Sequence, residues 1–423
     1  MTAFQNRLAN AVELASTEPW NCLSHVLGER AIETARLLDA MEPAAVSRLP
    51  LAGVPYVVKS LFDVKGIPTL AGGPADPNGH PADSDASLVQ ILGEAGAVPI
   101  AVAHMDEYAY GFLGDNPHYG PVINPADPRA FAGGSSSGCA AAVAAGIVPF
   151  AIGSDTNGSV RVPAAFCGLY ALKPSHGKLP LQGSFPLAPS LDHAGIIASS
   201  LDWLRRVWSA LAPGRDSRDG AIAGFITGDH ERLSKASVRD GYANLRARWR
   251  EAPDIALNHV EASLSAASII TGFEAAAVHR DRLAARPHLY SRATAARLAA
   301  AAQLSAGDYG LALRVQRSIR DEILDAMDSH NVDVLVVPTT PVDRIAVGEK
   351  SVVLDGICVL APDAVGLFTR PFSLAGLPVL TVPRRSGTGH SPGRPALQLI
   401  GRANEETTLF GFAAELLKSD GNG

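Results

Sequence analysis

One short stretch of this sequence places a serine where it could act as a nucleophile. The segment Gly153–Arg161 reads GSDTNGSVR, with Ser159 in a glycine-flanked turn. A serine hydroxyl needs a base to remove its proton before it can attack a carbonyl carbon. No histidine lies within fifteen residues of Ser159 on either side, so the base must come from elsewhere in the chain.

Lys59 is a candidate for that base. It follows the mostly apolar run Gly53–Val58, which is typical of a buried strand. Burial disfavours the charged ammonium group, and a neutral lysine amine is a competent general base. Taken alone, the pattern also fits a surface lysine at the end of a strand, so the role of Lys59 depends on the residues around it.

A second group of serines lies in the glycine-rich segment Gly133–Gly138, which reads GGSSSG. With Ser136 at its centre, this segment formally matches the G-x-S-x-G nucleophile elbow of α/β-hydrolases. An elbow needs a strand directly before its serine, but the loop 124–131 precedes this one. The sequence therefore argues against Ser136 as an elbow nucleophile.

Other common catalytic patterns are also incomplete. The spacing of Gly133 and Gly138 suits a phosphate-binding loop, but Cys139 and Ala140 stand where such a loop needs Lys followed by Ser or Thr. None of the twelve histidines lies in an H-E-x-x-H or comparable metal-binding motif. The sequence therefore predicts no nucleotide site, no metal and no other cofactor.

Composition and charge narrow the class of protein. The 423 residues carry a net charge of -6 with scattered Lys and Arg, so we expect no nucleic-acid partner. The four cysteines show no CxxC or Cys/His spacing, which is typical of reduced thiols. The N-terminus has no signal-peptide pattern, and the longest apolar run, 139–153, is too short to span a membrane. We therefore expect a cytoplasmic protein with no membrane-spanning segment.

The candidate residues must be positioned by elements that alternate along the chain. Apolar runs predict strands at 51–59, 98–102, 148–152, 334–337 and 379–382. Helical periodicity is found at 3–41, 88–95, 139–145 and 409–418, and the charged segment 200–325 is more helical than the rest. This alternation favours an α/β sheet over a helical bundle.

Four motifs taken in order resemble the amidase signature family. They are VKSLFDVKG at 58–66, GGSSSG at 133–138, GSDTNGSVR at 153–161 and PAAFCG at 163–168, followed by LKPSHG at 172–177. The resemblance extends from about residue 20 to 415. It implies a single α/β domain over 1–423, with a central mixed β-sheet covered by helices on both faces. Its core would span about 51–197, and the chain would return to that core at about 330–418 after the helical segment 200–325.

The resemblance also implies a source for the missing base. In this family a lysine activates a serine held by a cis peptide bond, and that serine activates the nucleophile. Carried over to this chain, Lys59 is the base, Ser135 is the bridging serine and Ser159 is the nucleophile. Ser135 precedes Ser159 by 24 residues, as the family pattern requires. Ser136 becomes a supporting hydrogen-bonding residue.

The turn around Ser159 would stabilise the negative charge of the reaction. The implied oxyanion hole consists of four successive backbone N–H groups, those of Thr156, Asn157, Gly158 and Ser159. We expect Asp155 and Arg161 to hold the turn by an ion pair or hydrogen bonds. Asn157 stands where the family usually has glycine. Because asparagine tolerates positive φ, we expect it to keep the turn and to offer its side-chain amide near the pocket.

Three further stretches resemble the 1-carboxybiuret hydrolase branch of the family: MDEYAYG at 105–111, HYG at 118–120 and SLDH at 190–193. This resemblance implies a small linear amide or urea-like substrate, such as 1-carboxybiuret or biuret, that is hydrolysed through an acyl-enzyme with release of ammonia. Tyr110, His193 and Arg370 are the candidate pocket residues. Arg370 could bind a substrate carboxylate in a bidentate way or form a surface ion pair.

The branch also implies a partner. Its members pair with a small wrapping subunit, so we expect either a heterotetramer with such a subunit or a homodimer. Two alternative functions stay open: a glutamine-hydrolysing amidotransferase subunit that supplies ammonia to a partner enzyme, and an amidase for another small amide. The presence of Lys59, Ser135 and Ser159 argues against a catalytically silent scaffold.

Overall fold

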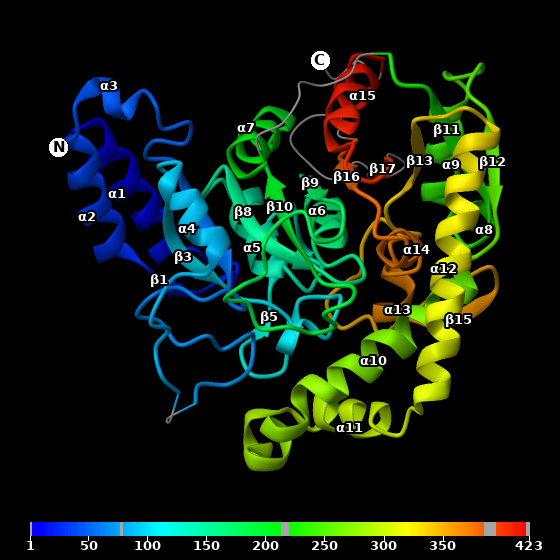
Figure 1. Ribbon diagram of the computed structural model, residues 1–423, viewed down its shortest axis with the longest axis horizontal. Helices are drawn as coiled ribbons and strands as arrows, with labels where there is room; N and C mark the ends of the chain where they lie inside the picture. Colours follow the sequence, from blue (N-terminus) through cyan, green and yellow to red (C-terminus); the bar gives the residue numbers. More distant parts are fainter. Residues whose placement is uncertain (1, 77–78, 213–219, 385–394, 420–423) are drawn as a thin grey trace.

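A single large sheet organises the computed structural model, which describes residues 2–76, 79–212, 220–384 and 395–419. Its strands are β1 (Leu23–Val26), β2 (Pro55–Lys59), β3 (Val98–Ala103), β8 (Phe150–Asp155), β9 (Tyr170–Lys173), β10 (His193–Ala198), β11 (Ala223–Gly228), β12 (Asp254–Leu257), β13 (Val334–Pro338), β16 (Val379–Val382) and β17 (Leu397–Ile400). The 11-stranded sheet has the order β1-β3-β2-β8-β10-β9-β16-β17-β13-β11-β12 (Figure 1). β2 runs parallel to β3 and β8, and β11 runs parallel to β12 and β13, whereas the other neighbours are antiparallel. The predicted mixed sheet is therefore confirmed.

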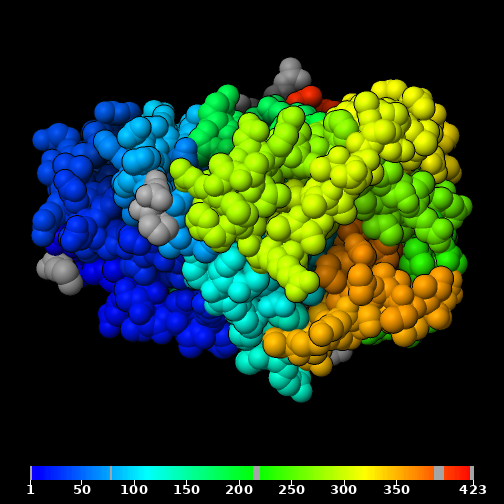
Figure 2. Space-filling model, turned by 90° about the horizontal axis from the view of Figure 1, so that it is seen from below, coloured from blue at the N-terminus to red at the C-terminus, as the bar shows by residue number. Residues whose placement is uncertain are grey.

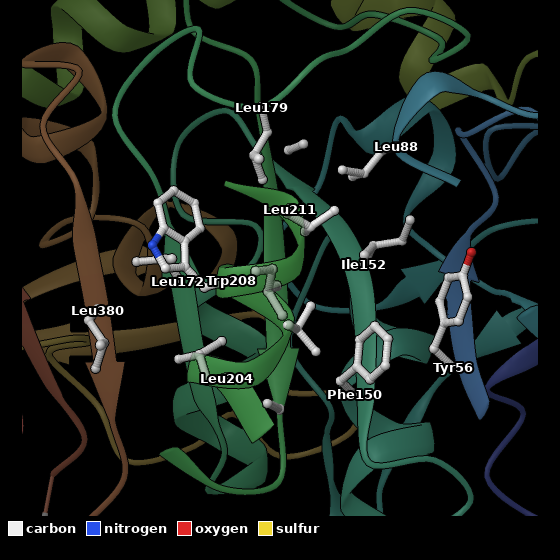
Figure 3. Packing of buried hydrophobic residues seen from close by; sticks show 14 of the residues in the cluster. Tyr56, Leu88, Phe150, Ile152, Leu172, Leu179, Leu204, Trp208, Leu211 and Leu380 are labelled. Atoms are coloured by element: carbon white, nitrogen blue, oxygen red, sulfur yellow. The ribbon is translucent and has the colours of Figure 1, made fainter. Parts of the chain in front are cut away.

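Helices cover both faces of the sheet, as the sequence predicts. One face packs against α1 (Ala3–Ser16), α2 (Gly28–Asp39) and α5 (Ser137–Ala144), and the other packs against α4 (Ser87–Glu94), α7 (Leu201–Leu211) and α15 (Glu406–Ser419). Side chains alternate across a strand, so Val57 joins the first of these cores while Tyr56 and Val58 join the second. Figure 3 shows part of the second core, where Trp208 of α7 lies near Leu172 of β9.

Three helices enclose a further core at the other half of the sheet. α10 (Val260–Ala285), α12 (Ala306–Ser329) and α14 (Arg370–Leu374) pack around Ile226, Leu335 and Val379. On the face shown in Figure 2, the yellow-green segment that contains α10 and α11 (Arg292–Ala301) adjoins a cyan segment and an orange segment. Parts of the chain that are far apart in sequence therefore meet on this face.

The remaining elements are short or lie outside the main sheet. Among the described residues, β4 with β5, β6 with β7, and β14 with β15 form separate hairpins.

In the described ranges, every helix is too short or too polar to span a bilayer. The bounds are α3 (Pro43–Val46), β4 (Asp115–Asn116), β5 (Gly120–Pro121), β6 (Ile123–Asn124), β7 (Asp127–Phe131), α6 (Arg161–Cys167), α8 (Asp229–Arg232), α9 (Ala236–Arg246), β14 (Ser351–Leu354), β15 (Ile357–Leu360) and α13 (Ala361–Val365), with 3₁₀ turns at Glu107–Ala109 and Pro287–Leu289.

Most predicted elements are present, but three regions differ. The helical periodicity at 3–41 belongs to two helices, and β1 lies between them. The segment 200–325, predicted to be more helical, also contributes β11 and β12 to the end of the main sheet. The strand predicted from residue 51 begins only at Pro55.

The parallel strands β2 and β8 place the candidate residues at one edge of the sheet. Val58 pairs with Ile152, so Lys59 at the end of β2 lies beside the last residues of β8. Side chains alternate along a strand, so Lys59 lies on the same face of the sheet as Val57, and α5 packs on that face. Ser135 lies just before α5 in the sequence. The carboxyl ends of strands in open α/β sheets are the usual place for a ligand site.

Candidate active site

Lys59 and Ser135 are in contact, although they lie 76 positions apart in the sequence. Lys59 Nζ lies 2.7 Å from Ser135 Oγ, 2.9 Å from Ser154 Oγ and 3.4 Å from the Ser154 carbonyl oxygen. Both Lys59 and Ser135 are fully buried. The peptide bond between Gly134 and Ser135 is cis. The structure therefore brings together two of the three residues that the resemblance assigns to catalysis.

The contacts of Lys59 suit a neutral amine. Such an amine has two N–H donors and one lone pair, and the two oxygens of Ser154 can accept both N–H groups. The lone pair is then left to face the hydroxyl of Ser135. Burial lowers the pKa of Lys59 to about 8, although acidic neighbours such as Asp106 oppose this shift. An appreciable fraction of Lys59 is therefore neutral near pH 8.

We expect amide hydrolysis to increase with pH as Lys59 loses its proton. Below pH 8 the amine is protonated and cannot accept the proton of Ser135, so kcat/KM should fall about tenfold per pH unit. Above about pH 9 it should become constant. The measurement is kcat/KM from about pH 6 to about pH 10 with biuret, which carries no charge over most of this range. A profile that is flat between pH 6 and 8 would contradict the role of Lys59.

Ser159 lies in the turn that follows β8, and Asp155 shapes this turn. Asp155 Oδ1 accepts a hydrogen bond from the Gly158 N–H at 2.7 Å, and Oδ2 accepts one from the Val160 N–H at 3.2 Å. The Ser136 N–H donates to the carbonyl oxygen of Ser159 at 3.1 Å. Ser159 is therefore held against the 133–138 segment that carries Ser135.

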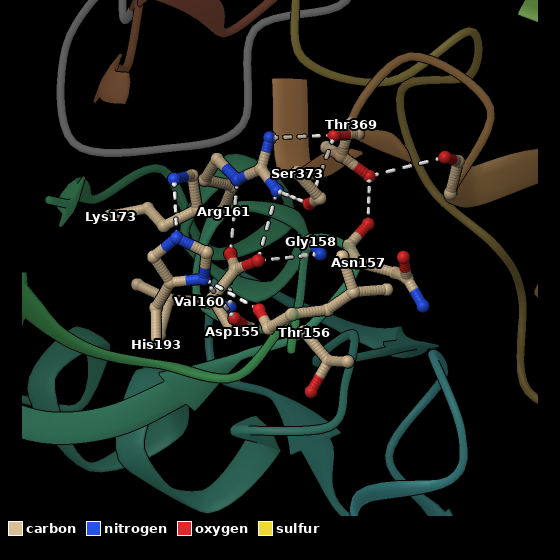
Figure 4. Close-up of polar contacts among 12 residues, drawn as sticks. Asp155, Thr156, Asn157, Gly158, Val160, Arg161, Lys173, His193, Thr369 and Ser373 are labelled. Carbon is tan, nitrogen blue, oxygen red and sulfur yellow. Dashed lines mark hydrogen bonds and ion pairs between the residues drawn. The ribbon is translucent and has the colours of Figure 1, made fainter. Parts of the chain in front are cut away.

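A buried ion pair anchors the same turn (Figure 4). Arg161 Nη2 and Nε lie 2.9 and 3.0 Å from the two carboxylate oxygens of Asp155, and both side chains are fully buried. Arg161 also donates to the Thr369 carbonyl oxygen, Ser373 Oγ and Gln398 Oε1. Burial alone would raise the pKa of Asp155, but Arg161 outweighs it and holds that pKa far below its usual value. Asp155 is therefore a charged structural group that positions the turn.

Two details of the turn differ from the sequence prediction. The Gly158 N–H already donates to Asp155, so it is not free to bind an oxyanion. The N–H groups of Thr156, Asn157 and Ser159 remain as candidates for that role. The positive φ of the turn falls on Gly158, at 135°, and not on Asn157 as we expected. Backbone conformation therefore does not explain why residue 157 is asparagine, whereas its side chain forms a hydrogen bond with Thr271.

The turn faces a pocket that several distant segments build. Tyr110 and Arg370 line it together with Ser159, as the sequence predicts. Arg297 of α11 and Thr271 of α10 also line it and were not predicted, because nothing near them in sequence marks them. The lining residues are Ala109, Tyr110, Gly111, Phe112, Thr156, Asn157, Ser159, Leu187, Ser268, Thr271, Arg297 and Arg370.

His193 lies behind the turn and not among the residues that line this pocket. Its Nδ1 lies 2.6 Å from the Leu191 carbonyl oxygen, and its Nε2 lies 3.2 Å from Lys173 Nζ (Figure 4). Burial and the nearby Lys173 lower the pKa of His193 well below its usual value. His193 Nδ1 also lies 3.2 Å from the Asp155 carbonyl oxygen, and the carboxylate of the neighbouring Asp192 accepts a hydrogen bond from Thr156 Oγ1 at 2.6 Å. Both residues therefore contact the start of the turn.

The two arginines give the pocket a positive charge. Arg370 is only 4 % exposed, and its Nη1 donates to the carbonyl oxygen of Asp363 at 2.9 Å. Its Nη2 also lies 3.4 Å from Asp363 Oδ1, so Arg370 lines the pocket and forms an ion pair as well. Burial lowers the pKa of Arg370 to about 10, so it is still charged at neutral pH. Arg297 is exposed, and its guanidinium lies 3.5 Å above the ring of Tyr110 while donating to the Tyr110 carbonyl oxygen at 2.8 Å. The pocket therefore suits a substrate that carries negative charge.

Comparison with characterised sequences gives consistent matches over most of the chain. The Amidase family model matches residues 8–236 and 237–410. AtzE, a 1-carboxybiuret hydrolase subunit of Pseudomonas sp. (strain ADP), is 38% identical over 393 residues, which cover 88% of this chain and 85% of that protein. A glutamyl-tRNA(Gln) amidotransferase subunit of Halorhodospira halophila is 34% identical over 440 residues, which cover 92% of this chain and 88% of that protein.

Solved structures show the same fold. One, described as "An unexpected vestigial protein complex reveals the evolutionary origins of an s-triazine catabolic enzyme", in an inhibitor-bound complex, superimposes with a TM-score of 0.91 at 32% identity. The match covers 99% of this chain and 96% of that chain. A crystal structure of an amidase superimposes with a TM-score of 0.90 at 31% identity, with the same coverage of 99% and 96%.

Proposed function

The chain belongs to the amidase family and is therefore an amidohydrolase that acts on a carbon–nitrogen bond, and we propose that its substrate is a small ureido carboxylate such as 1-carboxybiuret. The observation that carries this proposal is the position of Arg297 and Arg370 in the pocket of Ser159. A guanidinium group binds a carboxylate through two parallel hydrogen bonds. The relative AtzE, a 1-carboxybiuret hydrolase subunit, supports the same substrate class.

In the mechanism that we propose, Lys59 acts on Ser159 through Ser135. Neutral Lys59 accepts the proton of Ser135, Ser135 accepts the proton of Ser159, and Ser159 Oγ attacks the terminal carbonyl carbon. Backbone N–H groups of the turn stabilise the oxyanion. When the carbon–nitrogen bond breaks, the proton returns through Ser135 to the leaving nitrogen, and ammonia departs. Water then attacks the acyl-enzyme with the same groups as base and acid.

Glutamine is the main competing substrate, because several relatives are amidotransferase subunits. Glutamine carries an α-ammonium group next to its carboxylate, and a site for it needs an acidic partner. Among the described residues that line the pocket there are two arginines but no aspartate or glutamate. The pocket charge therefore favours an anion without a nearby cationic group.

A panel of five substrates tests the proposal: biuret, 1-carboxybiuret, allophanate, glutamine and an aryl amide. We expect ammonia release to be fastest with a ureido carboxylate. Faster release from glutamine, above all if it increased sharply with an added partner protein, would favour the amidotransferase alternative. We also propose that a small subunit binds this chain, since the relatives include amidotransferase subunits and a chain solved in a protein complex.

Replacing Arg370 by methionine should weaken the recognition of carboxylate substrates. Loss of a charge-assisted hydrogen bond corresponds to about 1.5–3 kcal/mol, so kcat/KM for 1-carboxybiuret should fall about 10- to 100-fold. Neutral biuret lacks the carboxylate, and its kcat/KM should change less than about threefold. Equal losses with both substrates would mean that Arg370 stabilises the fold and does not bind the carboxylate. A lower unfolding temperature of the same variant would show such a loss of stability independently.

A further inference from the structure

The side chain of Asn157 presents an unpaired hydrogen-bond acceptor at the wall of the pocket. Asn157 is 7 % exposed and lines the pocket together with Ser159 and Thr271. Its Nδ2 donates to Thr271 Oγ1 at 2.8 Å. Its Oδ1 is buried and has no hydrogen-bond partner among the residues that the structure describes. Proteins pair nearly all buried polar atoms, so an exception beside a nucleophile calls for a functional explanation.

The surroundings of Asn157 fix the direction of this acceptor. Thr369 Oγ1 donates to the Asn157 carbonyl oxygen at 2.5 Å and holds its backbone (Figure 4). A side chain at Gly158 would collide with Thr369, so only glycine fits next to Asn157 in this turn. The hydrogen bond to Thr271 holds the amide nitrogen on the α10 side. Hydrogen bonds therefore hold both the backbone carbonyl and the amide nitrogen of Asn157, and these two contacts set the position of Oδ1.

We propose that Asn157 Oδ1 accepts a hydrogen bond from the N–H next to the scissile carbonyl of a ureido substrate, which makes Asn157 a specificity-determining residue. A ureido group carries this N–H where a plain carboxamide carries a CH₂ group. The turn that holds Ser159 also holds Asn157, so the acceptor lies beside the carbonyl that Ser159 attacks. The inference rests on the proposed function, because Arg297 and Arg370 must bind the carboxylate for the N–H to face Asn157.

Two stable compounds that differ only at this position give a direct test. Hydantoate has an N–H where succinamate has a CH₂ group, and both have a terminal amide and a carboxylate. The quantity to measure is the ratio of kcat/KM for hydantoate to kcat/KM for succinamate, in the wild type and in each variant. Comparing ratios between proteins cancels the difference in intrinsic reactivity between a urea and an amide.

We expect Asn157→Ala to lower this ratio by about 10- to 100-fold, because only hydantoate loses a hydrogen bond. Thr271→Val, which frees the Asn157 amide, should lower the ratio by a smaller factor, and Thr271→Ser, which keeps the hydroxyl, should preserve it. An unchanged ratio in Asn157→Ala, with wild-type protein that hydrolyses hydantoate, would overturn the role of Asn157 alone. Wild-type protein that hydrolyses neither compound but does hydrolyse glutamine would overturn the proposed function, and this inference with it.

Discussion

Replacing Ser159 by alanine should abolish amide hydrolysis, with a loss in kcat of at least about 10⁴-fold. The hydroxyl of Ser159 is the proposed nucleophile, and alanine leaves no atom to form the acyl-enzyme. The same variant should no longer react with a fluorophosphonate probe, which labels activated serine hydroxyls. Ammonia release and probe labelling of the purified protein measure the two effects.

Ser136 supplies the matched control for this experiment. It lies next to Ser135 in the same buried segment, and its Oγ donates to the Ser154 carbonyl oxygen at 3.2 Å. Ser136→Ala should therefore keep most of the labelling. If Ser136→Ala lost the labelling while Ser159→Ala kept it, the nucleophile would be Ser136, and the relay through Ser135 would be wrong.

Replacing Lys59 should reduce kcat by several orders of magnitude. Lys59 Nζ lies 2.7 Å from Ser135 Oγ, and we propose no other base for this serine. General-base catalysis contributes about 10²- to 10⁴-fold, so a loss in this range is expected for Lys59→Met, which also keeps most of the side-chain volume. Steady-state kinetics and a thermal unfolding curve on the same sample separate the loss of the base from a loss of fold.

Lys65 belongs to the same sequence motif but is exposed, so Lys65→Ala is a suitable control. We expect its kcat/KM to stay within about twofold of the wild type, as is usual for surface substitutions. If Lys59→Met retained activity within about tenfold of the wild type, another group would have to remove the proton, and the assignment of Lys59 would fail.

The sequence predicts the strands that are mostly apolar and misses the shorter or more polar ones, wherever they lie in the sheet. β2, β3, β8, β13 and β16 are buried along their whole length and mostly apolar, and such runs are visible in a sequence. β1 is short and partly exposed, so its residues do not stand out between two helices. β17 interrupts its apolar pattern with Gln398, which is buried because it binds Arg161 and the Phe368 carbonyl oxygen.

The residues of the site also fall into two groups, those that the sequence identified and those that only the structure shows. Ser159, Ser135 and Lys59 lie in motifs that resemble a family, and this resemblance, rather than spacing alone, connected them. Arg297 and Thr271 lie on helices more than a hundred residues later in the chain, and only the packing of α10 and α11 brings them to Ser159. No local pattern marks such residues, because their surroundings are created by the fold.

The ion pair of Asp155 and Arg161 has a consequence for the synthesis of the protein. Arg161 Nη1 binds Thr369 and Gln398, which follow it by 208 and 237 positions. Before these residues are added, the guanidinium lacks both acceptors and also Ser373 Oγ, and the strand that carries Gln398 is missing from the sheet. The buried ion pair that shapes the turn of Ser159 therefore gains its full set of partners only after residue 398 has been added and β17 has joined the sheet.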